Sequence, residues 1–167
     1  MQITIFKDIK ETSQPFYRPV EVILKRIQEG SSKDLVKKIR AEKNKDNRNI
    51  LKQKLPAICF SGTFNKRSDN SLKKHSGLIC LDFDGYPSNK VMLMEKEKLS
   101  KDKFVYTVFI SPSGKGLKAL VKIPVDPENH KNYFNSLEVY FNSDYFDKTS
   151  KNISRVCYES YDPLLYI

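Results

Sequence analysis

The pattern of hydrophobic and polar residues predicts a chain that contains both strands and helices. Residues 1–6 and 117–123 alternate between apolar and polar side chains, as short half-buried strands do. Residues 78–81 and 104–110 are almost continuously apolar, which is typical of strands buried on both faces. Two further short strands are expected over residues 57–60 and 154–159.

Between residues 18 and 54 the apolar positions recur at helical spacing instead. The first helix of this segment carries its apolar positions at Val20, Ile23, Leu24 and Ile27. Ser32 can cap a second helix, and a third short helix is expected before the chain reaches the strand at 57–60. Longer amphipathic helices are expected over residues 88–99 and 127–141, with His130 on the helix surface.

The size and composition of the chain favour one globular domain. It has 167 residues, a hydrophobic fraction of 39%, nine Tyr and ten Phe, which is enough for a real core. We therefore expect a single α+β domain over residues 1–167, in which the helical segment 18–54 packs on a core formed by residues 55–167. Cys59, Cys80 and Cys157 lie in separate apolar runs and are expected to be buried thiols of a reducing compartment.

The charge of the chain suggests a polyanionic partner. Thirty basic residues face 20 acidic ones, so the formal net charge is +10. Residues 21–54 contain 11 basic and 5 acidic residues, and such a surface can follow a phosphate backbone. An ordinary solvated helix face would explain the same charges. Because the chain has no secretory leader and no apolar run of about 18 residues, we expect a cytoplasmic protein without a membrane partner.

The strongest chemical signal is the stretch Ser76-Gly-Leu-Ile-Cys-Leu-Asp-Phe-Asp-Gly85. A buried strand delivers Asp82 and Asp84 at its end, and residues two apart on a strand point to the same side. Two carboxylates in this position repel each other, and a bound cation relieves that repulsion. The stretch therefore predicts a divalent-metal site for phosphoryl chemistry.

A second signal follows the strand at 104–110. The segment Ser111-Pro-Ser-Gly-Lys-Gly-Leu-Lys118 can turn tightly and present backbone N–H groups to an anion, with Lys118 at the start of the next strand. The spacing differs from the phosphate loop of nucleoside triphosphatases and from the dinucleotide-binding motif. Taken alone, the segment is equally typical of a simple hairpin turn.

A third group of residues lies in the expected loop over residues 63–75, directly before the acidic strand. Its basic residues could neutralise template or nucleotide phosphates, or they could be ordinary loop charges. They are Lys66, Arg67, Lys73, Lys74 and His75.

Taken in order, these signals resemble the archaeo-eukaryotic primase or primase-polymerase superfamily. That pattern is an acidic pair, then a serine-glycine turn that ends in a basic residue, then a third acid. The chain more closely resembles the VirE N-terminal-like family, primase-type domains of Bacteroidetes and their mobile elements or phages. The phrases that carry the resemblance are Leu55-Pro-Ala-Ile-Cys-Phe-Ser-Gly62, Ser76 to Asp84, Ser111 to Lys118, Ser154-Arg155 and Asp162-Pro163.

The resemblance implies a fold and a set of site residues. The fold would have a mixed, largely antiparallel sheet with the acidic strand in its centre, a core related to RNA-recognition folds. Asp82, Asp84 and Asp147 would be the catalytic carboxylates and the ligands of Mg²⁺ or Mn²⁺, with Asp144 as the alternative third acid. The nucleotide-binding residues would be Ser113, Gly114, Gly116, Lys118 and Arg155.

The implied function is nucleotidyl transfer in DNA replication of a mobile element, phage or bacterial genome. Its partners would be nucleoside triphosphates, single-stranded or primed DNA, and a helicase domain or protein. Lys118 stands where the superfamily usually has histidine, and a lysine binds phosphate as a point charge but cannot act as a neutral imidazole. This departure leaves a catalytically silent nucleic-acid-binding module open.

A haloacid-dehalogenase-like phosphatase is the other enzyme class to consider, because Leu81-Asp-Phe-Asp-Gly85 resembles its nucleophile motif. That motif normally opens a chain and is followed by Thr or Val, whereas Tyr86 follows here. The late acidic pair of that class is also missing. We therefore rank it below the primase interpretation.

Overall fold

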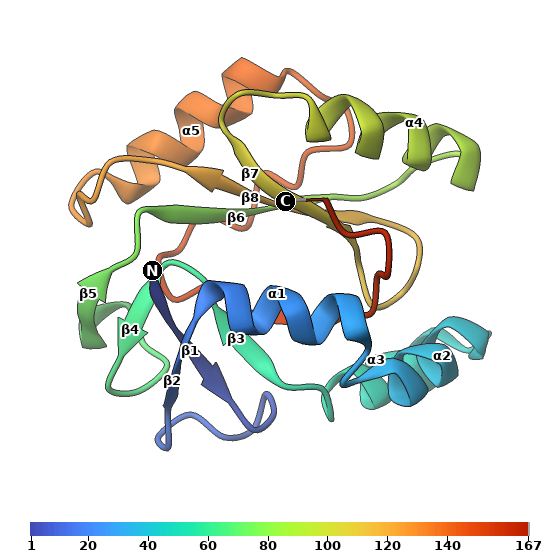
Figure 1. The fold of residues 1–167 in the computed structure, drawn as a ribbon, viewed down its shortest axis with the longest axis horizontal. Helices are drawn as coiled ribbons and strands as arrows, with labels where there is room; N and C mark the ends of the chain where they lie inside the picture. Colours follow the sequence, from blue (N-terminus) through green and yellow to red (C-terminus); the bar gives the residue numbers. More distant parts are fainter. Residues whose placement is uncertain (167) are drawn as a thin grey trace.

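Two antiparallel sheets with a helix between them form the body of the protein (Figure 1). The computed structural model describes residues 1–166. Helix α1 (Val20–Glu29) lies between the sheets, and its residues Val20, Ile23, Leu24 and Ile27 are fully buried. These are the four positions that the helical spacing predicted. Gly30 ends the helix with a φ of 90°, a conformation that glycine adopts without strain.

The three-stranded sheet carries the acidic strand. Its order is β6 (Leu78–Phe83), β8 (Leu117–Lys122) and β7 (Val105–Ile110), so β6 is an edge strand. The expectation of a central acidic strand was wrong, because β8 pairs with both neighbours and takes the middle position. Helices α4 (Asn89–Ser100) and α5 (His130–Phe141) cover the face of this sheet that points away from α1 (Figure 1).

The four-stranded sheet has the order β2 (Phe16–Pro19), β1 (Gln2–Phe6), β3 (Ala57–Cys59) and β9 (Cys157–Tyr158). Strand β3 pairs with β1 on one side and with β9 on the other, so the first and last strands of the chain lie in one sheet. This pairing makes β1 part of the core. The sequence did not predict β2, and β9 is shorter than expected. Neither strand has enough alternating apolar residues to stand out from its polar surroundings.

Residues 63–75, expected to be a loop, instead contain a small hairpin. Strands β4 (Gly62–Phe64) and β5 (Leu72–His75) pair around the short 3₁₀ helix η1 (Asp69–Ser71). Phe64 is fully buried and is a main apolar contact of this hairpin. Because so few apolar residues are involved, the pattern of apolar and polar residues is too short to indicate strands.

The predicted basic helices are present beside the two sheets. Helices α2 (Lys33–Ala41) and α3 (Lys45–Lys52) pack through a small cluster that includes Val36, Ile39 and Leu55. The fold is thus α+β, and all pairings between named strands are antiparallel. Among residues 1–166, no helix combines the length and the apolar composition that a membrane crossing needs. The three cysteines are buried and free, as expected.

Candidate active site

The end of strand β6 meets a loop from much later in the chain. The backbone N–H of Asp84 donates to the carbonyl of Tyr145 at 2.8 Å, and the N–H of Asp147 donates to the carbonyl of Asp82 at 2.9 Å. Between these bonds, Phe83 and Phe146 form an antiparallel bridge. The loop therefore extends the sheet beyond β6 and brings Asp147 beside the acidic pair.

The three carboxylates share one cavity of about 240 Å³, which we call the acidic cleft. Strands β6 and β8, the β7–β8 turn, helix α3 and the segment that precedes and forms β9 all contribute to its walls. The residues that line it are Lys52, Asp82, Asp84, Ser111, Pro112, Ser113, Lys118, Asp147, Arg155, Val156 and Tyr158.

Asp82 is buried in the cleft and paired with a lysine. It stands directly opposite Lys118 in the antiparallel register of β6 and β8. The Lys118 Nζ lies 2.5 Å from Asp82 Oδ1. Burial by itself lowers the pKa of Lys118, but the Asp82 carboxylate outweighs it, so the pKa is raised and the ammonium stays charged.

Asp147 is held by its own loop and by an arginine. Its Oδ1 accepts hydrogen bonds from the Thr149 N–H at 2.9 Å and the Thr149 hydroxyl at 2.7 Å. Its Oδ2 accepts from the Ser150 hydroxyl at 2.7 Å and lies 3.7 Å from Arg155. Burial acts to raise the pKa of Asp147, but these donors stabilise the charged form, so the pKa is lowered.

Asp84 is the exposed member of the three. The pKa of Asp84 is raised, because partial desolvation and the negative charges of Asp82 and Asp147 outweigh the attraction of Lys118. Its carboxylate rests on Gly116, where an added Cβ would lie 2.0 Å from Asp84 Oδ1 and 2.7 Å from the Phe83 carbonyl oxygen. Only glycine fits at position 116 while the carboxylate stays in place.

The two candidates for the third acid occupy different places. Asp147 lines the acidic cleft, whereas Asp144 lines a separate cavity with Glu138 and Lys148. The structure therefore brings Asp147, and not Asp144, to the Asp82/Asp84 pair.

The serine-glycine turn forms one wall of the cleft. Ser111 and Ser113 share a hydrogen bond of 3.0 Å between their hydroxyls, and Gly114 has a φ of 73°. Arg40 of helix α2 packs against this turn and donates to the Ser111 carbonyl at 3.3 Å. Helix α2 thus supports the turn from outside through Arg40, which links the segment 18–54 to the cleft.

Arg155 lies between Asp82 and Asp147, and one of its N–H groups has no hydrogen-bond acceptor among residues 1–166. Its terminal nitrogen is 3.6 Å from Asp82 Oδ2 and 3.7 Å from Asp147 Oδ2. Its Nε is buried and has no acceptor among residues 1–166. The guanidinium of Arg155 lines the cleft and can donate a hydrogen bond to a further anionic oxygen.

Two polar residues of the cleft were not predicted from the sequence. Lys52, the last residue of α3, enters the cleft, and its pKa is lowered by burial and by repulsion from Arg48 and Lys118. Tyr158 of β9 lines the cleft as well. Burial raises the pKa of Tyr158, opposed by the charges of Arg67 and Arg155. The basic surplus of residues 21–54 was the only sequence signal for Lys52.

The basic residues of the β4–β5 region lie outside the acidic cleft. Lys66, Lys73 and Lys74 are exposed, and Arg67 is half-buried. His75 differs from the expectation of an accessible phosphate ligand, because it is buried and its Nε2 lies 3.0 Å from Nδ1 of His130. His130 is also buried, so its expected place on the helix surface was wrong.

The donor groups of the cleft are of the type that binds a divalent cation. Carboxylate oxygens are the ligands that Mg²⁺ and Mn²⁺ prefer. The pKa of Asp84 is raised, and none of the hydrogen bonds among residues 1–166 involves its carboxylate. Among residues 1–166, however, no three His, Cys, Asp or Glu side chains are placed so that they could hold one metal ion together. Lys118 occupies the Asp82 oxygen that would complete the set.

Comparisons with known proteins give one match. The model of a family described as "BT4734-like, N-terminal domain" matches residues 50–166, a range that contains every residue lining the acidic cleft. Neither the curated proteins nor the solved structures that were compared gave a match.

Proposed function

The chain belongs to the BT4734-like, N-terminal domain family, and on that premise we propose that it is a primase-polymerase-type nucleotidyltransferase domain. It would join nucleoside triphosphates on a single-stranded or primed DNA template. The observation that carries this proposal is the meeting of Asp82, Asp84 and Asp147 with Lys118 and Arg155 in one cleft. Carboxylates and fixed cations at one site are the groups that phosphoryl transfer uses.

The cations of the chain hold the substrate in this proposal. Lys118 and Arg155 bind the triphosphate, and Lys52 adds a third positive charge from helix α3. The guanidinium of Arg155 can donate a hydrogen bond to a phosphate oxygen. Ser111 and Ser113 line the same wall and would add hydroxyl groups to a phosphate site.

The carboxylates would hold Mg²⁺ or Mn²⁺. Bound to Asp82, Asp84 and Asp147, the ion would neutralise developing charge and lower the pKa of the attacking hydroxyl. The hydroxyl oxygen of a primer, or of a first nucleotide, would form a bond to the α-phosphorus while the bond from that phosphorus to the bridging oxygen breaks. Pyrophosphate would leave, and the hydroxyl proton would pass to water. The chain itself contributes the alignment of these groups, because β6, β8 and the loop at 145–147 fix the acids and Lys118 on one edge.

A specific observation favours a second candidate, a nucleic-acid-binding module without catalysis. The 2.5 Å contact between Lys118 and Asp82 already neutralises the carboxylate that a metal needs. In this candidate the contact is permanent, and the net charge of +10 alone draws the chain to nucleic acid.

Incorporation of labelled nucleotides on primed and unprimed single-stranded DNA, with Mg²⁺ or Mn²⁺, separates the two candidates. The nucleotidyltransferase gives metal-dependent products that Asp82→Asn and Asp147→Asn abolish. Asp144→Asn is the matched control, since it removes a carboxylate three residues away that lies in another cavity. Absence of product under all conditions, with DNA binding unchanged by a chelator, would establish the binding module instead.

A further inference from the structure

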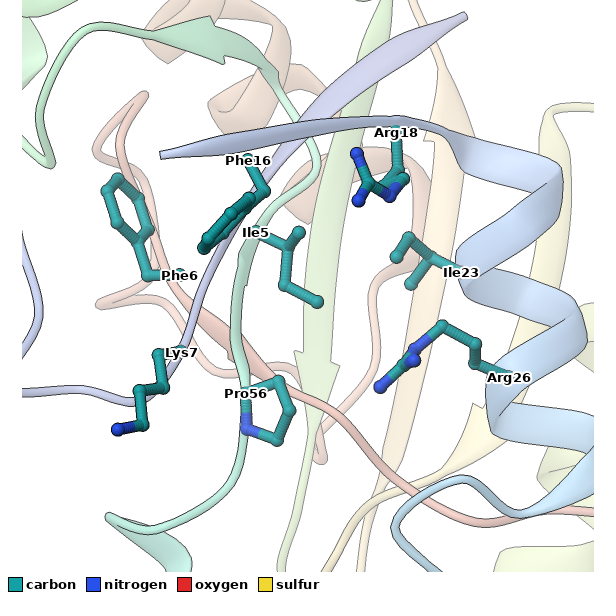
Figure 2. Close-up of a pocket in the computed structure, with 8 residues that line it drawn as sticks. All are labelled: Ile5, Phe6, Lys7, Phe16, Arg18, Ile23, Arg26 and Pro56. Atoms are coloured by element: carbon teal, nitrogen blue, oxygen red, sulfur yellow. The ribbon is translucent and has the colours of Figure 1, made fainter. Parts of the chain in front are cut away.

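A second cavity, of about 430 Å³, lies at the N-terminal part of the fold, and we call it the N-terminal pocket. Figure 2 shows it between strands β1 and β2 on one side and helix α1 on the other. Apart from Pro56, its lining comes from residues before position 50, outside the range that the family model matches. The pocket is therefore a feature separate from the acidic cleft.

The wall of this pocket presents an exposed aromatic ring. Phe16 is 52% exposed and stacks on no other aromatic ring among residues 1–166. It stands opposite Ile5 in the β1–β2 register, and Ile23 of α1 continues the apolar floor (Figure 2). An accessible ring beside an apolar floor suits a flat aromatic ligand.

Cationic side chains surround this ring. Lys7 and Arg18 are exposed, and Arg18 lies two residues from Phe16, so both project from the same side of β2. Arg26 is fixed by Glu159, with contacts of 2.6 and 3.1 Å to its two carboxylate oxygens. Within the part of the chain that the structure describes, no acidic residue lines the pocket. The ligand is therefore expected to carry negative charge next to its flat apolar part.

We infer that the N-terminal pocket binds single-stranded nucleic acid by stacking one unpaired base on Phe16. Arg18 and Lys7 would contact the flanking phosphates. A base paired inside a duplex has its faces covered by the neighbouring bases of the stack, so stacking on Phe16 selects single strands. The inference rests on the proposed function only for the choice of DNA as the partner, because the pocket shares no lining residue with the acidic cleft.

The absence of tryptophan from the chain gives this inference a direct test. In Phe16→Trp, the new indole is the single tryptophan, and its fluorescence is quenched when a base stacks on it. The titrant is a dodecamer of deoxythymidine, and the control titrant is a dodecamer of abasic deoxyribose phosphate with the same charge. Val139→Trp is the matched control protein, since Val139 is 78% exposed on α5, on the other side of the fold.

We expect the thymidine strand to quench Phe16→Trp but not Val139→Trp, and the abasic strand to quench neither. In fluorescence anisotropy, Phe16→Ala should raise the Kd for the thymidine strand by about fivefold or more, since loss of one stacked base has effects of this size. Phe16 is exposed on an edge strand, so this variant is expected to fold. Arg18→Ala should lower the salt dependence of binding.

Three results would overturn the inference. The first is equal affinity of the wild type for the thymidine and abasic strands, and the second is no change of Kd in Phe16→Ala. The third is equal quenching of Phe16→Trp by polyglutamate, which would indicate an acidic peptide as the ligand. Repeating the titration with Asp82→Asn distinguishes this inference from the proposed function, because the pocket should bind the strand whether or not the cleft is catalytic.

Discussion

Replacing Lys118 by methionine removes the ammonium group that faces Asp82 and keeps most of the side-chain volume. The side chain of Asp82 is 7% exposed, and its Oδ1 would lose a partner at 2.5 Å. Its remaining contacts are Arg155 at 3.6 Å and the Ser150 hydroxyl at 3.4 Å, both to Oδ2. Lys118→Met therefore leaves a buried carboxylate with weak compensation.

Removal of one partner from a buried ion pair typically costs about 3–5 kcal/mol. Because Arg155 stays within reach of Asp82, we expect the lower end of this range, about 3 kcal/mol of unfolding free energy. For a domain of this length that corresponds to a decrease in Tm of roughly 6–12 °C. The double variant Asp82→Asn/Lys118→Met removes both charges and should recover most of the loss.

Urea unfolding followed by circular dichroism, with and without Mn²⁺, measures these effects. A divalent cation should restore stability to Lys118→Met, because it can take the place of the ammonium at Asp82. At about 100 times its Kd, such an ion contributes about 2.7 kcal/mol. In the wild type the ion competes with Lys118, so the gain should be smaller.

Two results would refute this reasoning. If Lys118→Met is as stable as the wild type, the contact with Asp82 contributes nothing to the fold. If Mn²⁺ stabilises the wild type and Lys118→Met to the same extent, then Lys118 does not compete for the carboxylate. Asp144→Asn serves as the control for nonspecific binding of the ion, because Asp144 lies outside the cleft.

Two further predictions concern glycine and histidine positions. Gly116→Ala should displace the carboxylate of Asp84, since the new Cβ would lie 2.0 Å from its oxygen. Overpacking of this kind costs about 1–3 kcal/mol of unfolding free energy. Nucleotide affinity measured by calorimetry should fall, and unchanged affinity would show that Asp84 is not part of the nucleotide site. Burial, with repulsion from His75, lowers the pKa of His130 to about 4, so unfolding free energy should be constant above pH 6.5 and fall by up to about 3 kcal/mol towards pH 4. Urea midpoints of the wild type and His130→Phe test this, and parallel pH profiles would contradict it.

The sequence pattern was sufficient for the elements that bury a continuous apolar face. Helix α1 and strands β6, β7 and β8 lie where their periodicity predicted, because each contributes several side chains to the core. The short strands β2, β4, β5 and β9 depend on pairing with distant segments, which no local pattern encodes. The order of the strands, with β6 at the edge, likewise follows from the tertiary fold.

For the cleft, the sequence indicated the residue types but not their distances. The alternation of a strand placed Asp82 and Asp84 on one side, and the turn after β7 indicated Lys118. The choice between Asp144 and Asp147 required the backbone pairing of residues 145–147 with β6, which connects segments more than 60 residues apart. Lys52 could not be selected among the 11 basic residues of its segment for the same reason.

The buried histidine pair shows a different limit of sequence analysis. His75 was predicted from its basic neighbours to face a phosphate, yet its ring packs against His130 of α5 at a centroid distance of 5.3 Å. Two histidines 55 residues apart can satisfy each other's ring nitrogens only when the fold brings β5 and α5 together. His75 has no local signal that predicts burial, whereas His130 shares the helical stripe of Phe134 and Leu137, and this spacing indicated the buried face.

The proposed function requires Asp82, Asp84 and Asp147 to act as one site for a divalent cation and a nucleoside triphosphate. Electron paramagnetic resonance of free Mn²⁺ during titration with the protein, in the presence of a nonhydrolysable triphosphate, measures this binding. We predict one binding site that Asp147→Asn weakens strongly and Asp144→Asn leaves unchanged. Equal binding by these two variants, or no protein-bound Mn²⁺ in the wild type, would rule out a shared metal site.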